Sequence, residues 1–332
     1  MSGVVKKAKR CLLKRVLLTG VSGFIGAALV NVAHEKGFII RGAVRSTSES
    51  IPSFVEQVAV GNILPNTNWQ MGLDGSDIVI HLAARVHVMQ DMASNPLSEF
   101  RLINTEATLN LARQAAESGV KRFIYLSSIK VNGELTSLGT PFTPDDIFVP
   151  TDHYALSKYE AEQGLLSLAK ETNMDVVIIR PPLVYGPKVK ANFLSMMKWL
   201  YNSIPLPFGA IQNKRSLVAL DNLIDLIITC IEHPSAANEV FLVSDDEDLS
   251  TSELLMRVSN AEGKRAWLLP VNQKVLEFCL GLIGKKNLAQ RLCASLQVDI
   301  SKTKKLLNWT PVISVDEGLK KTTQYFIESN KP

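Results

Sequence analysis

A glycine-rich turn near the N-terminus constrains the fold of this chain more than any other feature. Gly20, Gly23 and Gly26 follow the apolar residues 16–19 and precede a helical pattern over residues 24–36. This spacing between a strand and a helix lets the backbone approach a pyrophosphate and points the helix N-terminus at it. A tight turn without a ligand is the alternative, but the flanking strand and helix favour a dinucleotide site.

Strand-like and helical patterns alternate along the following residues. Apolar strand patterns lie at residues 38–44, 55–60, 77–81, 122–128 and 174–180. Helical patterns cover residues 97–118 and 154–172, and Gly119 is a suitable C-cap for the first of them. Alternating strands and helices are typical of a parallel sheet with right-handed crossovers. We therefore predict an α/β fold, a Rossmann-type doubly wound parallel sheet.

The pattern changes after Pro181 and Pro182, where proline-broken segments and separate helical stretches begin. We predict a basic tail at residues 1–12 and an NAD(P)-binding Rossmann domain at residues 13–182. Residues 216–233 are predicted to belong to this domain as well. Residues 183–332 are predicted to form a smaller, mixed substrate-binding region interleaved with the sheet.

Charge and composition narrow the class of protein. The chain has 332 residues, of which 46% are hydrophobic and 20% charged, as in globular proteins with a large core. Its net charge is +4, but six lysines and arginines precede residue 16 without an acid, so the remainder is negative. The basic character belongs to the tail, and we predict no nucleic-acid partner.

No targeting segment or metal site is indicated by the sequence. The apolar stretch at residues 11–13 is too short for a signal peptide, which predicts a cytoplasmic protein. Residues 275–283 are apolar but contain Glu277 and are too short to span a bilayer. We expect a packed or partner-contacting helix there, with loose membrane association as the alternative. The four cysteines and five histidines lack ligand spacing, so no metal is predicted.

Three side chains predict a proton-transfer site. Tyr154 and Lys158 are four residues apart, which places the phenol and the ammonium on one helical face, and Ser128 ends a strand pattern. A free tyrosine has a pKa of about 10, and lowering it to about 7 takes about 4 kcal/mol from nearby cations. Each residue alone is common, but their order after the glycine turn predicts a hydroxyl acid/base beside a nicotinamide.

The end of the second strand bears on the choice of nicotinamide cofactor. An NAD enzyme normally has an acid there to bind the ribose 2′-hydroxyl, whereas this chain has Arg45 and Ser46, with no acid before Glu49. Arg45 can accept a 2′-phosphate, and Ser46 can donate a hydrogen bond to it. An exposed arginine without a ligand is the alternative. We predict NADP(H) as the favoured cofactor, with NAD(H) as a second choice.

Taken together, these residues resemble the extended short-chain dehydrogenase/reductase family of the NAD-dependent epimerase/dehydratase type. The resemblance runs from about residue 16 to residue 325. The stretches that carry it, besides the glycine turn, are His81-Leu82-Ala83-Ala84, Asn104, Ser128, Tyr154, Lys158, Arg180-Pro181-Pro182-Leu183-Val184-Tyr185-Gly186-Pro187, Arg215, Asp221-Asn222, and residues 299–303 and 307–311.

The resemblance implies a set of site residues. Those expected at the cofactor are Gly20, Ser22, Gly23, Phe24, Ile25, Gly26, Arg45, Ser46, Asn62, Ile63, Leu82, Ala83, Ala84, Asn104, Tyr154, Lys158, Pro181 and Val184. Those expected at the substrate are Arg85, Ser128, Lys130, Asn192, Arg215 and Asp221. The catalytic residues are expected to be Ser128, Tyr154 and Lys158. A guanidinium at Arg215 suits a diphosphate because it binds phosphate oxygens bidentately.

The residues after Ser128 discriminate between reactions. Dehydratases of this family carry an Asp-Glu pair there, whereas this chain has Ile129 and Lys130, and an ammonium cannot replace the acid. The chain also resembles an O-antigen and capsule subgroup of UDP-4-keto-sugar reductases and UDP-glucose 4-epimerase-like proteins.

Of the remaining reactions, we favour a reductase of a UDP-4-keto-6-deoxy-hexosamine in polysaccharide precursor synthesis, with Tyr154 as proton donor. A UDP-glucose or UDP-N-acetylglucosamine 4-epimerase with tightly bound NAD is the alternative. A dehydrogenase of another small alcohol, steroid-like or flavonoid-like, is a further one, and a non-enzymatic NADP(H)-binding regulator is a minor one. Relatives often pair through the helices at residues 97–118 and 154–172, which predicts a homodimer.

Overall fold

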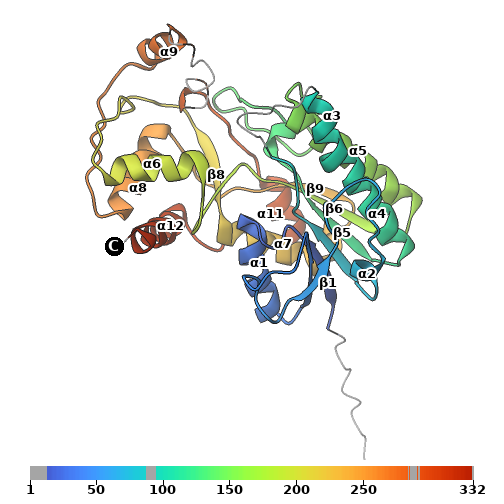
Figure 1. The fold of residues 1–332 in the computed structure, drawn as a ribbon. Coiled ribbons are helices and arrows are strands. Elements are labelled where there is room, and N and C mark those ends of the chain that lie inside the picture. Colours follow the sequence, from blue (N-terminus) through green and yellow to red (C-terminus); the bar gives the residue numbers. More distant parts are fainter. Residues whose placement is uncertain (1–12, 87–94, 283, 285–289, 291, 331–332) are drawn as a thin grey trace, which may run out of the picture.

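A seven-stranded parallel sheet forms the centre of the computed structural model, which describes residues 13–86, 95–282, 284, 290 and 292–330 (Figure 1). Its strand order is β3-β2-β1-β4-β5-β6-β9. The strands are β1 (Arg15–Thr19), β2 (Ile39–Val44), β3 (Glu56–Ala59), β4 (Ile78–His81), β5 (Arg122–Leu126), β6 (Asp175–Arg180) and β9 (Glu239–Leu242). The chain order reverses between β1 and β4, and doubly wound sheets bind ligands at such a switch point. The predicted fold class is confirmed.

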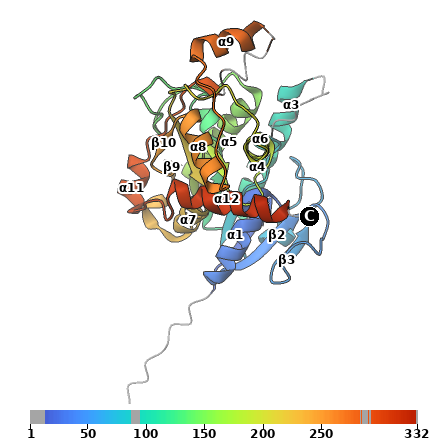
Figure 2. The same cartoon turned by 90° about the vertical axis from the view of Figure 1, so that its left-hand side faces the viewer.

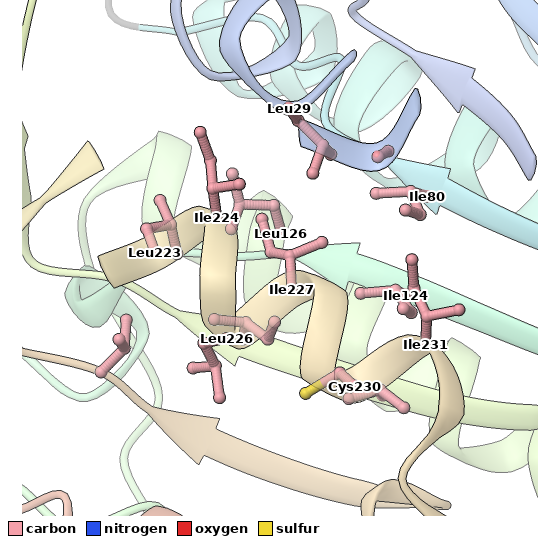
Figure 3. Packing of buried hydrophobic residues seen from close by; sticks show 14 of the residues in the cluster. Leu29, Ile80, Ile124, Leu126, Leu223, Ile224, Leu226, Ile227, Cys230 and Ile231 are labelled. Carbon is pink, nitrogen blue, oxygen red and sulfur yellow. The ribbon is translucent and has the colours of Figure 1, made fainter. Parts of the chain in front are cut away.

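Alternate side chains of the strands enter two separate cores. Val16 and Leu18 of β1 point to one face, where they belong to the same core as α1 (Phe24–Glu35) and α7 (Leu220–Glu232). Figure 3 shows this core, with Leu29 of α1 and Ile227 of α7 near Ile80 and Ile124 of the sheet. Leu17 points to the other face. The helices on that side are α2 (Gln70–Leu73), α4 (Ala107–Glu117) and α5 (His153–Glu171). This alternation explains why the inner strands are continuous apolar runs in the sequence, because a sheet covered on both faces buries the side chains that point to either side.

The helix predicted at residues 97–118 is interrupted in the structure. It consists of α3 (Pro96–Phe100), a π-helical turn (Arg101–Glu106) and α4, and it ends before Gly119, whose φ is +80°. Asn104 lies in the π-helical turn and is buried. Such turns often occur at functional sites because they redirect a side chain. Apolar periodicity cannot reveal this single-residue insertion.

A second, smaller lobe contains the three-stranded sheet β10-β8-β7. Its elements are β7 (Leu183–Tyr185), α6 (Ala191–Tyr201), β8 (Arg215–Ala219), β10 (Asp248–Leu249), α8 (Thr251–Ala261), α9 (Gln273–Leu282) and α12 (Val315–Ser329). Helices α8 and α12 pack together in this lobe, as Figure 2 shows. A further helix, α11 (Ser301–Leu307), lies against β9.

The return of the chain to the large sheet differs in detail from the prediction. Residues 216–233 supply β8 of the small sheet and α7, which covers the large one, whereas the strand that joins the large sheet is β9, beside β6. Because β9 is only four residues long, its apolar pattern is too weak to predict a strand from the sequence. The division at residue 182 stays a proposal.

No helix within the described ranges is long and apolar enough to cross a membrane. The stretch predicted at residues 275–283 forms most of α9, and residue 283 lies outside the described residues, as does the basic tail at residues 1–12. Among the residues with described positions, no cluster of histidine, cysteine, aspartate and glutamate could hold a metal ion.

Candidate active site

The glycine turn forms a backbone cradle between β1 and α1. Gly20 has a φ of +72°, which favours glycine, and the amide of Gly23 donates to the Gly20 carbonyl at 2.9 Å. A Cβ on Gly26 would lie 2.1 Å from the Gly20 oxygen, so only glycine fits there. Helix α1 begins at Phe24 without a side-chain cap or an acid in its first turn. Its free amides fit a pyrophosphate, because the helix dipole places partial positive charge at this end.

Replacing Gly26 with alanine should weaken binding of the nicotinamide dinucleotide at least tenfold, because the new methyl group forces the Gly20 carbonyl out of the turn. Calorimetric titration with NAD⁺ measures this. Gly281→Ala is the matched control, since a Cβ there meets no atom within 4 Å. Equal affinities of the Gly26 variant and the parent protein would contradict the cradle.

A buried hydrogen-bond chain fixes the carboxyl ends of β1 and β4. The Thr19 hydroxyl bonds His81 Nδ1 at 2.8 Å and accepts from the Ala83 amide at 3.2 Å, while His81 Nε2 bonds the Thr108 hydroxyl at 3.0 Å. Burial, reinforced by the charge of Lys158, lowers the pKa of His81 to about 3. His81 is therefore a neutral structural residue that holds residues 82–84 at the sheet edge.

Asn104 connects the segment after β4 to α5. Its side-chain oxygen accepts from the Arg85 amide at 2.8 Å, and its nitrogen donates to the Arg85 carbonyl and to the Ser157 hydroxyl, both at 3.0 Å. The Ser157 hydroxyl in turn donates to the Tyr154 carbonyl at 2.7 Å. These bonds occupy the amide of Asn104, so the structure supports a positioning contribution, and its predicted contact with the cofactor stays a prediction.

Ser128 and Tyr154 meet at the carboxyl edge of the sheet. Ser128 follows β5 and caps the 3₁₀ turn Ile129–Val131 by accepting from the Lys130 amide at 3.3 Å. Burial raises the pKa of Tyr154 to about 12, and a hydrogen bond with the Ser128 hydroxyl opposes this rise. The Tyr154 ring packs edge-on against Phe100 at 6.1 Å between centroids. The two hydroxyls are thus together, as a shared bond to one substrate oxygen requires.

The ammonium of Lys158 is buried beneath Tyr154, one turn further along α5. Its Nζ donates to the Leu126 carbonyl at 2.9 Å and lies 4.5 Å from the centroid of the Tyr125 ring. Burial lowers the pKa of Lys158 to about 7, although the charge of Glu162 opposes the fall. The sequence predicts a lowered pKa for Tyr154, whereas the described residues raise it. Burial of the phenol raises this pKa more than the hydrogen bond with Ser128 lowers it. The Lys158 ammonium donates to the Leu126 carbonyl.

A buried ion pair behind Lys158 is absent from the sequence-based site. Arg180 Nε donates to both carboxylate oxygens of Glu162, at 3.0 and 3.2 Å, and Nη2 donates to one of them at 2.5 Å. Arg180 Nη1 donates to Asn132 Oδ1 at 2.9 Å. Glu162 follows Lys158 by one helical turn, so the spacing Tyr154-x-x-x-Lys158-x-x-x-Glu162 was the available signal.

The residues predicted to hold the adenosine end lie at the carboxyl edge of β2 and β3. Arg45 and Ser46 follow β2 and are exposed, and Asn62 and Ile63 follow β3, its neighbour in the sheet. The remaining predicted cofactor residues lie in or beside the glycine turn, directly after β4, directly after β6, or in β7. They are Ser22, Phe24, Ile25, Leu82, Ala83, Ala84, Pro181 and Val184.

Lys130 and Arg85, two residues predicted at the substrate, each contact a neighbour of Tyr154. Lys130 Nζ lies 3.1 Å from a Glu134 oxygen and 3.6 Å from an oxygen of Asp152, the N-cap of α5. The Arg85 guanidinium lies over the Phe100 ring at 5.7 Å. Lys130 is linked to the start of α5 through its N-cap, and Arg85 is linked to Tyr154 through the Phe100 ring, so their predicted contact with the substrate stays a prediction.

The residues predicted on the small lobe are less closely grouped. Arg215 begins β8, is half-buried, and donates to the Ala294 carbonyl at 3.0 Å, and burial lowers its pKa. Asn192 is exposed at the start of α6. Asp221 pairs with Lys321 of α12 at 2.6 Å, which is a contact between helices. Among the described residues, Asp221 makes no hydrogen bond or ion pair with Tyr154, and its predicted contact with the substrate stays a prediction.

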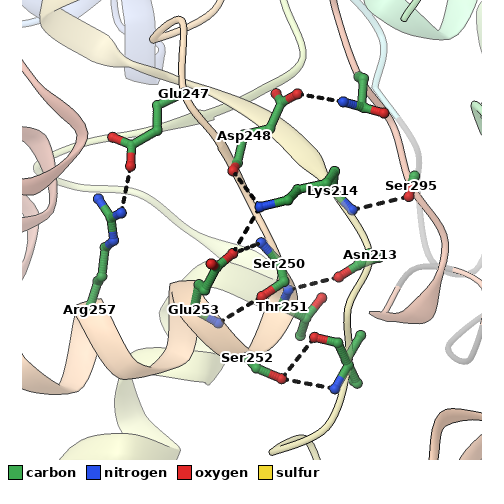
Figure 4. A network of polar contacts seen from close by, with 12 residues as sticks. Asn213, Lys214, Glu247, Asp248, Ser250, Thr251, Ser252, Glu253, Arg257 and Ser295 are labelled. Carbon is green, nitrogen blue, oxygen red and sulfur yellow. Dashed lines mark hydrogen bonds and ion pairs between the residues drawn. The ribbon is translucent and has the colours of Figure 1, made fainter. Parts of the chain in front are cut away.

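A polar network holds the segment that carries Arg215 (Figure 4). Asn213 accepts from the Thr251 amide at 2.8 Å, and the Lys214 amide donates to the Ser295 hydroxyl at 3.0 Å. Lys214 Nζ also lies 3.4 Å from a Glu253 oxygen. This network ties β8 to α8 and to residues 294–296, so Arg215 is presented from a fixed frame.

Comparisons with known proteins agree with this geometry. Residues 16–244 match the model of the family described as "NAD dependent epimerase/dehydratase family". The chain is 49% identical to a UDP-glucose 4-epimerase of Vibrio cholerae over 319 residues, which are 96% of this chain and 97% of that protein.

Two further similarities are more distant. The chain is 27% identical to the N-acetyl-alpha-D-glucosaminyl-diphospho-ditrans,octacis-undecaprenol 4-epimerase of Escherichia coli O157:H7, over 95% of this chain and 96% of that one. A crystal structure of a UDP-glucuronic acid 4-epimerase from Bacillus cereus with NAD shares the fold, with a TM-score of 0.77 and 21% identity, over 96% of this chain and 100% of that one.

Proposed function

Because this chain belongs to the NAD dependent epimerase/dehydratase family, we propose that it is a UDP-sugar 4-epimerase that uses NAD(H). The observation that carries the proposal is the 49% identity to a UDP-glucose 4-epimerase over nearly the whole of both chains. The grouping of Ser128 and Tyr154 above Lys158 supports it, because the reaction needs a hydroxyl acid/base beside a nicotinamide.

In the proposed reaction, Tyr154 takes the proton of the sugar C4 hydroxyl and later returns it. The chemistry that a bound nicotinamide would supply is a hydride acceptor for C4 in its oxidised form, NAD⁺, and a hydride donor to the opposite face of the 4-ketone in its reduced form, NADH. Ser128 donates a hydrogen bond to the C4 oxygen and so orients it toward the phenol. The low pKa of Lys158 follows from burial, and an adjacent tyrosinate would favour its charged form. The cradle at Gly26 and the end of α1 would hold the pyrophosphate.

The substrate is proposed to bridge the two lobes. Arg215, held by the Ala294 carbonyl, and Asn192 would contact its diphosphate, and Arg85 and Lys130 would lie toward the sugar. Ile129 and Lys130 stand where a dehydratase needs its Asp-Glu pair, which supports epimerisation over loss of water.

A UDP-4-keto-sugar reductase is the second candidate, favoured by Arg45 and Ser46. These two exposed residues follow β2 without an acid, as suits the 2′-phosphate of NADPH. A reductase must exchange its cofactor in each cycle, whereas an epimerase retains it. For both candidate functions, we propose that the product is a precursor of O-antigen or capsule polysaccharides.

One experiment separates the two candidates. The purified protein is incubated with UDP-glucose or UDP-N-acetylglucosamine without added nucleotide, and the products are resolved by chromatography. Formation of the C4 epimer supports the epimerase. A parallel sample receives NADPH and a UDP-4-keto-6-deoxy-N-acetylhexosamine. Stoichiometric oxidation of NADPH without epimer formation in the first sample would overturn the epimerase in favour of the reductase.

Arg45→Asp should shift the ratio of NAD⁺ to NADP⁺ affinity toward NAD⁺ at least tenfold. The new carboxylate can accept from the ribose 2′-hydroxyl and repels a 2′-phosphate. Calorimetric titration with both nucleotides measures the ratio. Arg265→Asp, which changes an exposed arginine of the small lobe in the same way, should leave it unchanged. An unchanged ratio in the Arg45 variant would remove this residue from the cofactor site.

A homodimer through the outer face of α4 and α5 also stays a proposal. A hollow of about 150 Å³ opens there, lined by Leu109, Arg113, Gly164, Ser167, Leu168 and Glu171. Light scattering on the purified protein would give the oligomeric state, and a monomer at all concentrations would exclude the pairing.

A further inference from the structure

The aromatic ring of Tyr125 lies against the ammonium group of the candidate active site. Tyr125 is fully buried in β5, and it is in register with His81 of the neighbouring strand β4. Its ring belongs to the core on the face of the sheet that α4 and α5 cover. Lys158 Nζ, one helical turn after Tyr154 in α5, lies over this ring at 4.5 Å from its centroid. A cation at this position is attracted by the negative charge on the face of the ring.

The Lys158 ammonium has little other compensation for its burial among the residues with described positions. Lys158 is 2% exposed, and within the described part of the chain it forms no ion pair. Its Nζ donates to the Leu126 carbonyl at 2.9 Å. The charge of Glu162 raises the pKa of Lys158, but both carboxylate oxygens of Glu162 accept from Arg180. Because a buried charge without a direct partner is costly, the contact with the Tyr125 ring should stabilise the charged form measurably.

A neutral imidazole also packs on the Tyr125 ring. His81 stacks on it with 5.9 Å between the ring centroids and 12° between the ring planes. The hydroxyls of Thr19 and Thr108 hold the two imidazole nitrogens, and burial, reinforced by the charge of Lys158, lowers the pKa of His81 to about 3. Because the imidazole is neutral, it fixes the ring without placing a second positive charge beside the ammonium. The packing around Tyr125 therefore suits a single cation.

We propose that Tyr125 is a positioning residue of the active site, whose ring face holds the Lys158 ammonium one helical turn from Tyr154 and favours its charged form. The consequence for turnover rests on the proposed function, because a charged Lys158 would stabilise the tyrosinate that accepts the proton. The charge of Lys158 itself is measured without a substrate. A failure of this inference and a failure of the proposed function therefore give different results.

The test is the pKa of Lys158, followed by NMR titration of the full chain labelled with ¹³C in its lysine side chains, with Lys158→Met assigning the signal. Tyr125→Leu should lower this pKa by about 1, because the ring face that stabilises the cation is lost. Tyr125→Phe should keep it near the parental value, because the ring remains. Phe123→Leu is the matched control, since Phe123 is equally buried two positions earlier on β5, and it should leave the Lys158 pKa unchanged.

A second series of variants tests the ring face while preserving the shape of the core, in case Tyr125→Leu does not fold. Phenylalanine with one, two or three fluorine atoms on its ring is incorporated at position 125. Fluorine withdraws electron density from the ring face, so the Lys158 pKa should fall with each added fluorine. The other titratable groups around the ammonium, which are Tyr154, His81 and Glu162 with its partner Arg180, stay in place throughout. Circular dichroism confirms that each variant is folded.

Turnover of a UDP-sugar at pH 8 provides the second readout. There kcat should fall about tenfold in Tyr125→Leu, since the charged fraction of Lys158 falls by that factor, and stay near the parental value in Tyr125→Phe. A constant Lys158 pKa across the fluorine series, an equal fall in the Phe123 control, or a parental kcat despite a lowered pKa would overturn the proposal. A lowered pKa in a protein that epimerises no UDP-sugar would support the contact with Tyr125 and count against the proposed function.

Discussion

Replacing Tyr154 with phenylalanine should lower kcat by about 10²–10⁴-fold while affinity for NAD⁺ stays within a few-fold. The hydroxyl is the only group lost, and the ring remains packed against Phe100. In the proposed reaction, the variant would have no proton acceptor at the C4 hydroxyl, so hydride transfer would have to leave negative charge on an oxygen that Ser128 alone would stabilise. Turnover of a UDP-sugar, measured by product chromatography, and nucleotide titration on the same sample separate the two effects.

Tyr159→Phe is the matched control for this change, because it removes a hydroxyl from the same helix five residues further along. It should retain the parental kcat. Ser128→Ala should lose less activity than the Tyr154 variant, since it removes a hydrogen bond and not the proton acceptor. If Tyr154→Phe turned over like the control, proton transfer would have to be assigned to another residue.

The large sheet was predictable because its determinants are local. Val16, Leu17 and Leu18 form an apolar run that ends in the glycine turn, and each later strand that we predicted for the Rossmann region is likewise a short run rich in apolar residues. The predicted and observed strands differ by one or two residues at their ends. By contrast, β9 and the π-helical turn depend on tertiary packing. β9 has only four residues, which is too few for a clear pattern. The π-helical turn changes the register of the backbone hydrogen bonds without changing the apolar pattern of the sequence.

The candidate site was predictable in its hydroxyls but not in its electrostatics. The spacing of Tyr154 and Lys158 gives one helical face, yet it does not show that Lys158 Nζ donates to the Leu126 carbonyl. Whether a buried lysine lowers the pKa of a nearby phenol depends on that partner and on desolvation of both groups. The sequence also conceals the pairing of Arg180 with Glu162, because the two residues come from β6 and α5.

Removing the charge of Glu162 should destabilise the protein by about 3–5 kcal/mol, because Glu162→Gln leaves the buried Arg180 guanidinium without its counter-ion. Urea unfolding followed by circular dichroism measures this loss. Glu160→Gln is the matched control two residues earlier on α5. Its carboxylate pairs with Arg101 at the surface, where solvent screens the interaction, so the control should change the free energy of unfolding far less.

The Glu162–Arg180 ion pair should also affect the pKa of Lys158, and this electrostatic effect can be measured separately from the effect on stability. The charge of Glu162 raises the pKa of Lys158 against the effect of burial, so Glu162→Gln should lower the pKa of Lys158 below about 7. A neutral Lys158 stabilises a tyrosinate less, and the folded variant should lose kcat. Replacing both Glu162 and Arg180 with methionine should recover much of the stability, because no unpaired charge is buried, but not the activity. Recovery of both would show that Glu162 acts only in packing, and a Glu162 variant as stable as the Glu160 control would contradict the buried pair itself.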